Sequence, residues 1–142
     1  MSNWAEDRIA LMDVMLRYAA GVDERDMVMY RSCFHDDVEV HGFGADGVVY
    51  RGGDVWTDYV VNALKRFGPT QHMLGPQLAT IDGDTAHCRT DVQALHYVLD
   101  QPGTTLTLWA TYRSDMVRTP QGWKIKRHEL VSRGTRIQPP TG

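Results

Sequence analysis

The sequence predicts an α+β fold in which a curved antiparallel sheet wraps around three N-terminal helices. Three helical patterns lie within the first 67 residues, and strand-type alternation fills most of the remainder. Turn sequences such as "DGD", "DQPG" and "TPQG" separate the long alternating stretches, which is typical of an antiparallel meander. Helices followed by a run of strands favour α+β over a parallel α/β sheet. A strongly bent sheet around the helices would form a cone with one open end.

Length and composition fit one domain spanning residues 1–142. A chain of 142 residues, 42% of them hydrophobic, can bury a core without disulfides or a metal. The net charge of −3 and the scattered basic residues give no sign of a nucleic-acid or acidic-membrane partner. No apolar run reaches the ~18 residues of a membrane helix, and the N-terminus lacks the apolar segment of a signal peptide. We therefore expect a cytoplasmic protein without membrane contact, in which Cys33 and Cys88 are reduced and buried.

Residues 3–22 are expected to form the first helix, which Asn3 or Ser2 would cap. Two neighbouring apolar stripes at 4-3-4-3 spacing predict a well-buried helix. The first stripe contains Ala5, Ile9, Met12, Leu16 and Ala19, and the second contains Leu11, Met15, Tyr18 and Val22. The next position of the first stripe is Asp23, so a carboxylate stands where a hydrophobic side chain was due.

Two shorter helices and a short hairpin are expected next. The second helix lies near residues 25–35, "DDVEVHGFG" alternates as a strand, "GADG" is a turn and "VVYRG" is a second strand. The third helix covers residues 54–67, with Asp54 as its cap and Gly68-Pro69 as its end. The inward side chains of these helices are Met27, Tyr30, Phe34, Trp56, Tyr59, Val60, Ala63, Leu64 and Phe67.

Four long strands are expected to make up the remainder. The first runs through "GPTQHMLGPQLATI" to the turn at 82–84, and the others cover about residues 85–99, 104–118 and 123–137. Period-2 alternation places one polar residue on each of the first three inward faces: His72, His96 and Tyr112. On the first strand His72 shares its face with Leu74 and Leu78. On the second, His96 shares its face with Ala86, Cys88, Val92, Ala94 and Val98, and on the third, Tyr112 shares its face with Leu106, Leu108, Ala110 and Met116. In the last strand Ile125 and Val131 would turn Arg127 and Arg133 inward, unless a bulge reverses the alternation.

These patterns predict a buried polar set of Asp23, His72, His96 and Tyr112, with Tyr18 near the end of the first helix. A buried carboxylate is costly unless it is paired, and histidine is a natural partner because one ring nitrogen remains free. Such a pair could act as a base for proton abstraction. Each residue also has a structural interpretation, since an aspartate after a helix can bind loop amides and a strand histidine can simply pack. The patterns leave both interpretations open.

Metal and cofactor chemistry find no support in the motifs. His87 and Cys88 of "HCRTD" alternate between faces, so they cannot share a zinc ion. A glycine-rich phosphate loop after a strand and a serine nucleophile elbow are both missing from the sequence. We therefore expect neither a metal nor a cofactor.

The segments "LRYAAGVDERDMVMYRSCFHDDVEV", "TQHML", "GDTAHCRTDVQALHY" and "RTPQGWKIKRHEL" resemble the SnoaL-like family of the nuclear-transport-factor-like superfamily. The resemblance runs from about Ile9 to Arg133 and implies the α+β cone fold. It leaves the function open, because the superfamily includes cyclases, dehydratases, isomerases and proteins that only bind ligands.

Within this superfamily the chain is similar to scytalone dehydratase, the bile-acid dehydratase and the hexachlorocyclohexane dehydrochlorinase. These enzymes use an Asp–His dyad, and the resemblance implies Asp23 and His72 as the matching pair. It also matches Tyr18 to a catalytic tyrosine of the bile-acid enzyme and His96 to a second histidine of the scytalone enzyme.

Departures from these enzymes lie around the dyad. Val22 and Gly42-Phe43 stand where the scytalone enzyme has tyrosines, and the lysine of the dehydrochlorinase has no counterpart. The groups that polarise the substrate therefore differ from those of the known enzymes.

The expected function is that of a cofactor-independent lyase or isomerase of the dehydratase or cyclase type. It would act on a small hydrophobic molecule, with or without a ring. Residues that could line its pocket are Phe43, Trp56, Leu74, Trp109 and Arg133. One alternative is a non-catalytic small-molecule-binding or assembly module of the same fold. Another is a small subunit of a ring-hydroxylating oxygenase. By analogy with the family, we expect a homodimer or homotrimer.

Overall fold

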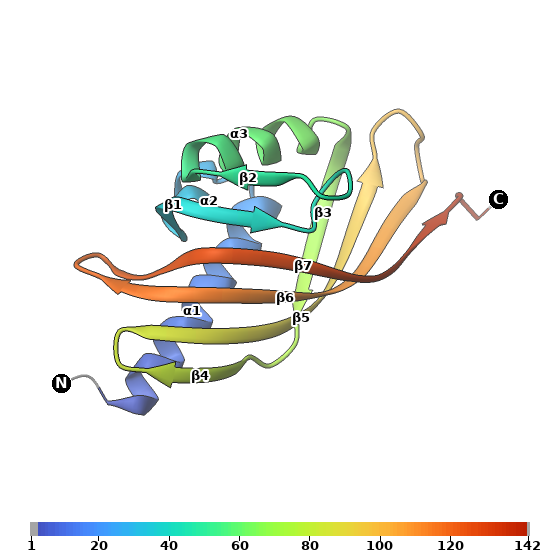
Figure 1. The fold of residues 1–142 in the computed structure, drawn as a ribbon. Coiled ribbons are helices and arrows are strands. Elements are labelled where there is room, and N and C mark those ends of the chain that lie inside the picture. The colour runs from blue at the N-terminus through green and yellow to red at the C-terminus, as the bar shows by residue number, and fades with distance from the viewer. Residues whose placement is uncertain (1–2, 142) are drawn as a thin grey trace.

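The computed structural model describes residues 3–141 and has the predicted α+β architecture (Figure 1). The N-terminal half contains α1 (Trp4–Asp23), α2 (Met27–Ser32), β1 (Phe34–His41), β2 (Val49–Arg51) and α3 (Gly53–Leu64). The strands that follow are β3 (Phe67–Leu74), β4 (Leu78–Asp82), β5 (Thr85–Val98), β6 (Thr105–Thr119) and β7 (Gly122–Gln138). Within residues 3–141, no helix is both long and apolar enough to cross a membrane.

The strands form one open, curved sheet in the order β2-β1-β7-β6-β5-β3, with β4 also paired to β5. Strands β5, β6 and β7 form the predicted antiparallel meander. Strand β1 joins the sheet parallel to β7, a long-range contact that no local pattern indicates. Figure 1 shows α1 lying across one face of the sheet, with α3 and the β1–β2 hairpin together at one end. This arrangement places the end of α1 beside β3.

Only one of the two predicted stripes of α1 is buried. Leu11 and Met15 of the second stripe are 0% and 1% exposed, whereas Ile9 and Leu16 of the first are 66% and 52% exposed. The expectation of a helix buried on a broad face is therefore wrong, because the sheet covers α1 from one side. Only the C-terminal end of the first stripe, at Ala19, turns into the core.

The helix caps follow the sequence at one helix and not at another. Asn3 caps α1, since its side chain accepts a hydrogen bond from the Glu6 backbone at 2.8 Å. Asp54 does not cap α3; the cap is Gly52, whose φ of 100° favours glycine. Asp54 lies in the first turn instead and pairs with Arg31.

Boundaries differ from the expectation at three places. The second helix ends at Ser32, and Phe34 lies in β1, although it is buried as predicted. Gly68-Pro69 does not end a helix, because α3 already ends at Leu64 and both residues belong to β3. The expected first long strand is broken between Leu74 and Leu78, so Leu78 is 64% exposed and does not share the inward face of His72.

The inward faces of β5 and β6 agree with the prediction, and β7 contains the bulge that the sequence left open. Asp115 pairs with Arg127 while the next residue, Met116, pairs with Ile125. One extra residue of β7 therefore lies between Ile125 and Arg127, and the alternation reverses there. As a result His128, rather than Arg127, points into the core, where it is fully buried.

The core lies between α1 and the concave face of the sheet and is rich in aromatic side chains. Cys33 and Cys88 belong to it as free thiols, as expected. Its largest fully buried side chains are Trp56, Tyr30, Phe34, Leu11, Met15, Met116, Ile125 and His128. Aromatic packing thus fills much of the space between the helices and the sheet.

Candidate active site

The structure brings Asp23, the last residue of α1, against His72 of β3. The His72 ring nitrogen Nδ1 lies 2.7 Å from Asp23 Oδ1, and the His72 backbone N–H donates to Oδ2 at 2.7 Å. The Thr70 hydroxyl lies 2.9 Å from Oδ1. The side chains of His72 and Asp23 are only 10% and 19% exposed. The carboxylate is therefore held by three donors in a sheltered position.

The protonation state of Asp23 follows from these contacts. Burial alone would raise the pKa of its carboxyl, but the hydrogen bonds from the His72 ring, the His72 backbone and Thr70 outweigh burial and lower the pKa below 3.8. An ionised carboxylate can only accept hydrogen bonds. The Nδ1 atom of His72 therefore carries a proton, and whenever the ring holds only this one proton its lone pair is on Nε2. Within residues 3–141, no protein group is hydrogen-bonded to that Nε2 atom.

His96 lies beside the dyad on β5. Because Thr70 pairs with His96 and His72 pairs with Ala94, the two histidines are diagonal neighbours, and their ring centroids are 5.7 Å apart. The His96 Nδ1 atom lies 3.0 Å from the Leu106 carbonyl oxygen, which can only accept, so Nδ1 carries the proton. Burial lowers the pKa of His96, and nearby His72 lowers it further. A neutral His96 therefore offers a lone pair on Nε2 and cannot donate from that atom.

Tyr18 of α1 and Tyr112 of β6 pack against each other in the core. They are 2% and 3% exposed, and their ring centroids are 5.1 Å apart. Burial raises the pKa of each hydroxyl well above 10.0, and the Asp23 charge contributes to the rise at Tyr112. Both side chains therefore remain protonated hydroxyls at physiological pH and can donate a hydrogen bond.

Sequence reasoning missed His128, which bonds to Tyr18. The His128 ring is 0% exposed, with Nε2 at 3.1 Å from the Tyr18 hydroxyl and Nδ1 at 2.8 Å from the Ser114 hydroxyl. Burial lowers its pKa from 6.5 to about 3, so the ring is neutral. The bulge in β7 hid it, since strict alternation assigned the inward positions to Arg127 and Arg133.

Sequence reasoning also missed Thr70 and Arg25. Thr70 shares the inward parity of His72, so alternation along β3 could have identified it. Arg25 lies just after α1 and donates to Thr70 Oγ1 at 2.9 Å, a contact that no periodicity indicates.

The expected pocket residues divide into two groups. Phe43 and Leu74 pack against the core, and Trp56 is fully buried there, with its indole N–H donating to the Tyr30 hydroxyl at 3.0 Å. Trp109 is 38% exposed on the opposite parity from Ala110. Arg133 is exposed and donates to Thr111 Oγ1 at 3.2 Å. The structure thus brings Phe43, Trp56 and Leu74 to the core, but not Trp109 or Arg133.

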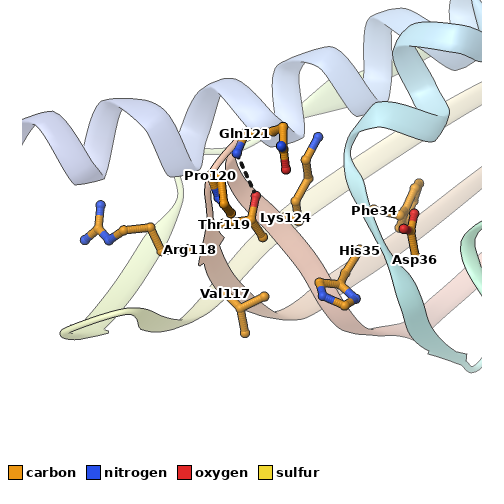
Figure 2. Close-up of a pocket in the computed structure, with 9 residues that line it drawn as sticks. All are labelled: Phe34, His35, Asp36, Val117, Arg118, Thr119, Pro120, Gln121 and Lys124. Atoms are coloured by element: carbon orange, nitrogen blue, oxygen red, sulfur yellow. Dashed lines mark hydrogen bonds between the residues drawn. The ribbon is translucent and has the colours of Figure 1, made fainter.

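Four surface clefts lie away from the dyad. The cleft in Figure 2 measures about 400 Å³ and lies between the start of β1 and the β6–β7 turn, where Thr119 accepts a hydrogen bond from the Gln121 backbone at 3.1 Å. It is lined by Phe34, His35, Asp36, Val117, Arg118, Thr119, Pro120, Gln121 and Lys124. Three further clefts of about 300–310 Å³ also lack Asp23 and His72. In the described part of the chain, no group of three or more His, Cys, Asp or Glu side chains could hold a metal ion.

Comparison with known proteins gives one family and many solved relatives in fold. The SnoaL-like domain matches residues 4–129. An uncharacterized protein of Mycobacterium tuberculosis, Rv2910c, is 28% identical over 123 residues, covering 85% of this chain and 82% of the relative. A hexachlorocyclohexane dehydrochlorinase (LinA, type 2) superposes with a TM-score of 0.86 at 20% identity, covering 96% of this chain and 92% of the other. A putative scytalone dehydratase from Novosphingobium aromaticivorans superposes with a TM-score of 0.79 at 24% identity, covering 94% of this chain and 91% of the other. These two likenesses show the shared fold.

Proposed function

The chain belongs to the SnoaL-like family, and we propose on that premise that it is a cofactor-independent lyase or isomerase. It would remove an acidic C–H proton from a small hydrophobic, ring-containing substrate. The observation that carries this proposal is the 2.7 Å hydrogen bond between Asp23 and His72 Nδ1, which leaves the lone pair of His72 Nε2 available. A sheltered imidazole with a carboxylate behind it is suited to general-base catalysis.

In the proposed reaction His72 Nε2 takes a proton from the carbon next to a carbonyl group. The C–H electron pair moves into the carbonyl and forms an enolate, and Asp23 stabilises the imidazolium that results. In an elimination, the enolate re-forms the carbonyl as a β-hydroxyl leaves, and the imidazolium returns its proton to that hydroxyl to give water. In an isomerisation, the same proton returns to a different carbon. General acid–base help of this kind contributes about 10²–10⁴-fold to the rate.

The developing oxyanion needs a hydrogen-bond donor, and the protonation states decide which side chains qualify. Neutral His96 does not qualify, because its one N–H is bonded to the Leu106 carbonyl. Tyr112 and Tyr18 are protonated hydroxyls and are our candidates, with Tyr112 first because the Asp23 charge contributes to the rise of its pKa. In this structure the Tyr112 hydroxyl bonds to that of Tyr18, and the Tyr18 hydroxyl lies 3.1 Å from His128 Nε2, so each hydroxyl would have to rotate toward the substrate. A preorganised donor contributes roughly 3 kcal/mol to such a transition state. The His96 lone pair is better suited to accept a hydrogen bond from a substrate hydroxyl.

The reactions named for two proteins of the same fold agree with this chemistry. One is a dehydrochlorinase and the other a putative dehydratase, and both names describe eliminations. Since one fold supports many functions, the argument depends on the dyad geometry rather than on the fold.

Proton exchange can test the proposal before the natural substrate is known. The probe is 1-tetralone in D₂O, a bicyclic aryl ketone with acidic protons next to its carbonyl, followed by proton NMR. We expect the wild type to accelerate loss of those proton signals and His72→Gln and Asp23→Asn to lose most of that acceleration. If wild type and His72→Gln exchange a panel of aryl and alicyclic ketones at the same rate, the proposed function is wrong.

A second candidate function, that of a non-catalytic assembly module, is favoured by the filled interior of the cone. Tyr18, Tyr30, Trp56 and Tyr112 are each at most 3% exposed. If this function is correct, Asp23 is a structural residue and Asp23→Asn lowers the melting temperature clearly without affecting any proton exchange. If the lyase or isomerase function is correct, the same change affects exchange far more than stability.

We also propose self-association into a homodimer or homotrimer. Apolar side chains are exposed near the ends of β5 and β7, with Tyr97 of β5 43%, Ile137 of β7 69% and Leu99, just after β5, 59% exposed. Light scattering after gel filtration would give the mass directly, and a monomer of 16.1 kDa at all concentrations would contradict this proposal.

A further inference from the structure

Arg25 adopts a backbone conformation that arginine rarely occupies. Its φ is 57°, and it is the one non-glycine residue with positive φ within residues 3–141. This residue ends α1 in a Schellman turn, in which the Arg25 backbone N–H donates to the Val22 carbonyl at 3.2 Å and the Asp26 backbone N–H donates to the Gly21 carbonyl at 2.8 Å. Glycine usually takes this left-handed position, so an arginine there costs backbone energy that its side-chain contacts can offset.

The Arg25 guanidinium ties the end of α1 to the start of β3. One nitrogen, Nη1, donates to the Val22 carbonyl at 2.8 Å and to Thr70 Oγ1 at 2.9 Å. The other, Nη2, donates to the Gly68 carbonyl at 2.7 Å. Arg25 thus connects the helix that carries Asp23 to the strand that carries His72.

The direction of the hydrogen bonds is fixed by their chemistry. A guanidinium has no acceptor, so Thr70 Oγ1 must accept from Arg25. The single hydroxyl proton of Thr70 is then directed at Asp23 Oδ1, 2.9 Å away. The His72 backbone N–H can only donate to Asp23 Oδ2. The series of hydrogen bonds from Arg25 through Thr70, and the bond from the His72 backbone, therefore all run toward the Asp23 carboxylate.

We propose that Arg25 is a positioning residue for the dyad: acting through Thr70, it holds Asp23 as a fixed acceptor and so keeps His72 in the tautomer with a free Nε2 lone pair. Its catalytic meaning rests on the proposed function, but the tautomer itself can be measured without turnover.

Without Arg25, the contacts around Asp23 lose their direction. The Thr70 hydroxyl becomes free to rotate and to donate to water or to a backbone carbonyl. Asp23 lies at the C-terminal end of α1, where the helix dipole disfavours a carboxylate, and the last turn of α1 contains no basic residue. The carboxylate can then turn away from Nδ1, and the His72 ring becomes free to place its proton on Nε2.

The test uses ¹⁵N-labelled histidine and NMR of the imidazole nitrogens, which distinguishes the two neutral tautomers of His72. The variants are Arg25→Ala and Thr70→Val, with Thr70→Ser as the conservative rescue because it keeps the hydroxyl. The matched control is Arg31→Ala, since Arg31 also donates three hydrogen bonds, to Asp54, Asp36 and the Phe34 carbonyl, but away from the dyad.

We expect the wild type, Thr70→Ser and Arg31→Ala to keep the Nδ1–H tautomer. Arg25→Ala and Thr70→Val should lower the ratio of Nδ1–H to Nε2–H by about 5-fold or more, the change that loss of one hydrogen bond produces. The same two variants should lower kcat for ketone exchange with little change in KM. The pKa of the Asp23 carboxyl, which Thr70 helps to lower, should rise in Thr70→Val.

Two results would overturn the proposal. One is an unchanged tautomer ratio in folded Thr70→Val and Arg25→Ala proteins, which would make Arg25 a helix tie only. The other is a wild-type ring that already carries its proton on Nε2. If the variants shift the ratio but the wild type exchanges no ketone, the positioning role stands and the proposed function fails, so the two failures are distinguishable.

Discussion

The two ends of α1 each insert one carboxylate into the cone, but they pair it with different partners. Asp7, in the first turn, accepts two hydrogen bonds from Arg118 at 2.8 and 3.0 Å and one from the Trp123 indole at 3.3 Å. Asp23, at the last residue, is bonded to His72 and Thr70. Both are largely sheltered from solvent and both join α1 to distant strands.

The difference lies in what the partner can do with a proton. The hydrogen bond to Asp7 raises the pKa of Arg118 further, so this guanidinium stays charged and cannot act as an acid or base. An imidazole can take up and release a proton in the physiological range. The helix dipole also favours a carboxylate at the Asp7 end and disfavours one at the Asp23 end. A buried, paired carboxylate by itself therefore indicates a contribution to stability. A partner that can gain and lose a proton makes acid–base chemistry possible as well.

The largest expected effect is on activity at the Asp23 end. His72→Gln and Asp23→Asn should each lower the rate of ketone proton exchange by about 10²–10⁴-fold, the contribution of general acid–base catalysis. The free energy of unfolding of Asp23→Asn should change by only about 1 kcal/mol, since the loss is one hydrogen-bonded group at a partly exposed position. Exchange rates and chemical denaturation measured on the same samples check this, and a large loss of stability with unchanged exchange would reverse the assignment.

The matching change at the other end should affect stability instead. Asp7→Ala removes the carboxylate that accepts from Trp123 and from two Arg118 nitrogens, while Arg118 keeps its 3.0 Å bond to Asp84. The change should lower the free energy of unfolding by about 2–3 kcal/mol. This is less than a fully buried pair would lose, because the Arg118 side chain is 29% exposed. Urea denaturation gives the value. Exchange activity per folded molecule should be unchanged, and a loss of activity without a loss of stability would show that the two ends are not separate.

A third difference between the ends should appear when the pH is lowered. His128 bonds to Tyr18 near the Asp23 end of α1, and burial lowers its pKa from 6.5 to about 3. The unfolded chain therefore binds a proton there first, so the stability from His128 is complete above pH 6.5 and is lost as the pH falls toward 3. The loss should be roughly 1.4 kcal/mol per pH unit within that window.

The variant His128→Phe separates the contribution of His128 from that of the carboxyl groups. His128→Phe should show a smaller slope of unfolding free energy against pH between about 6 and 4 than the wild type does. Asp23 contributes with the same sign but only below its ordinary pKa of 3.8, because its folded pKa is lowered from that value. Equal slopes in wild type and His128→Phe would mean that His128 is not held neutral by burial.

The parts of the fold that local patterns predicted are those in which neighbouring residues decide the structure. Alternation identified the inward faces of β5 and β6, and the Asn3 cap was recognisable from its residue type. The failures came where distant segments decide. The exposure of Ile9 and Leu16 depends on which side of α1 the sheet covers.

The candidate site shows the same division. Asp23 and His72 could be paired from the chemistry of a buried carboxylate and from the family resemblance, and the structure puts their atoms 2.7 Å apart. His128 was out of reach because one extra residue in β7 reverses its facing, and a bulge depends on pairing with β6 rather than on the strand itself. Arg25 was out of reach because its role depends on a 2.9 Å contact with β3.

The smallest expected effect concerns the cap beside Asp7. Asn3 accepts the Glu6 backbone N–H at 2.8 Å at the start of α1, so Asn3→Ala should lower the free energy of unfolding by about 1 kcal/mol. Since the cap lies at the opposite end of the helix from His72, ketone exchange and the His72 tautomer ratio should both stay at wild-type values. Hydrogen exchange of the first-turn amides would locate the loss, which should be confined to the N-terminal end. A change in the His72 tautomer on removing this cap would instead mean that α1 transmits strain along its full length.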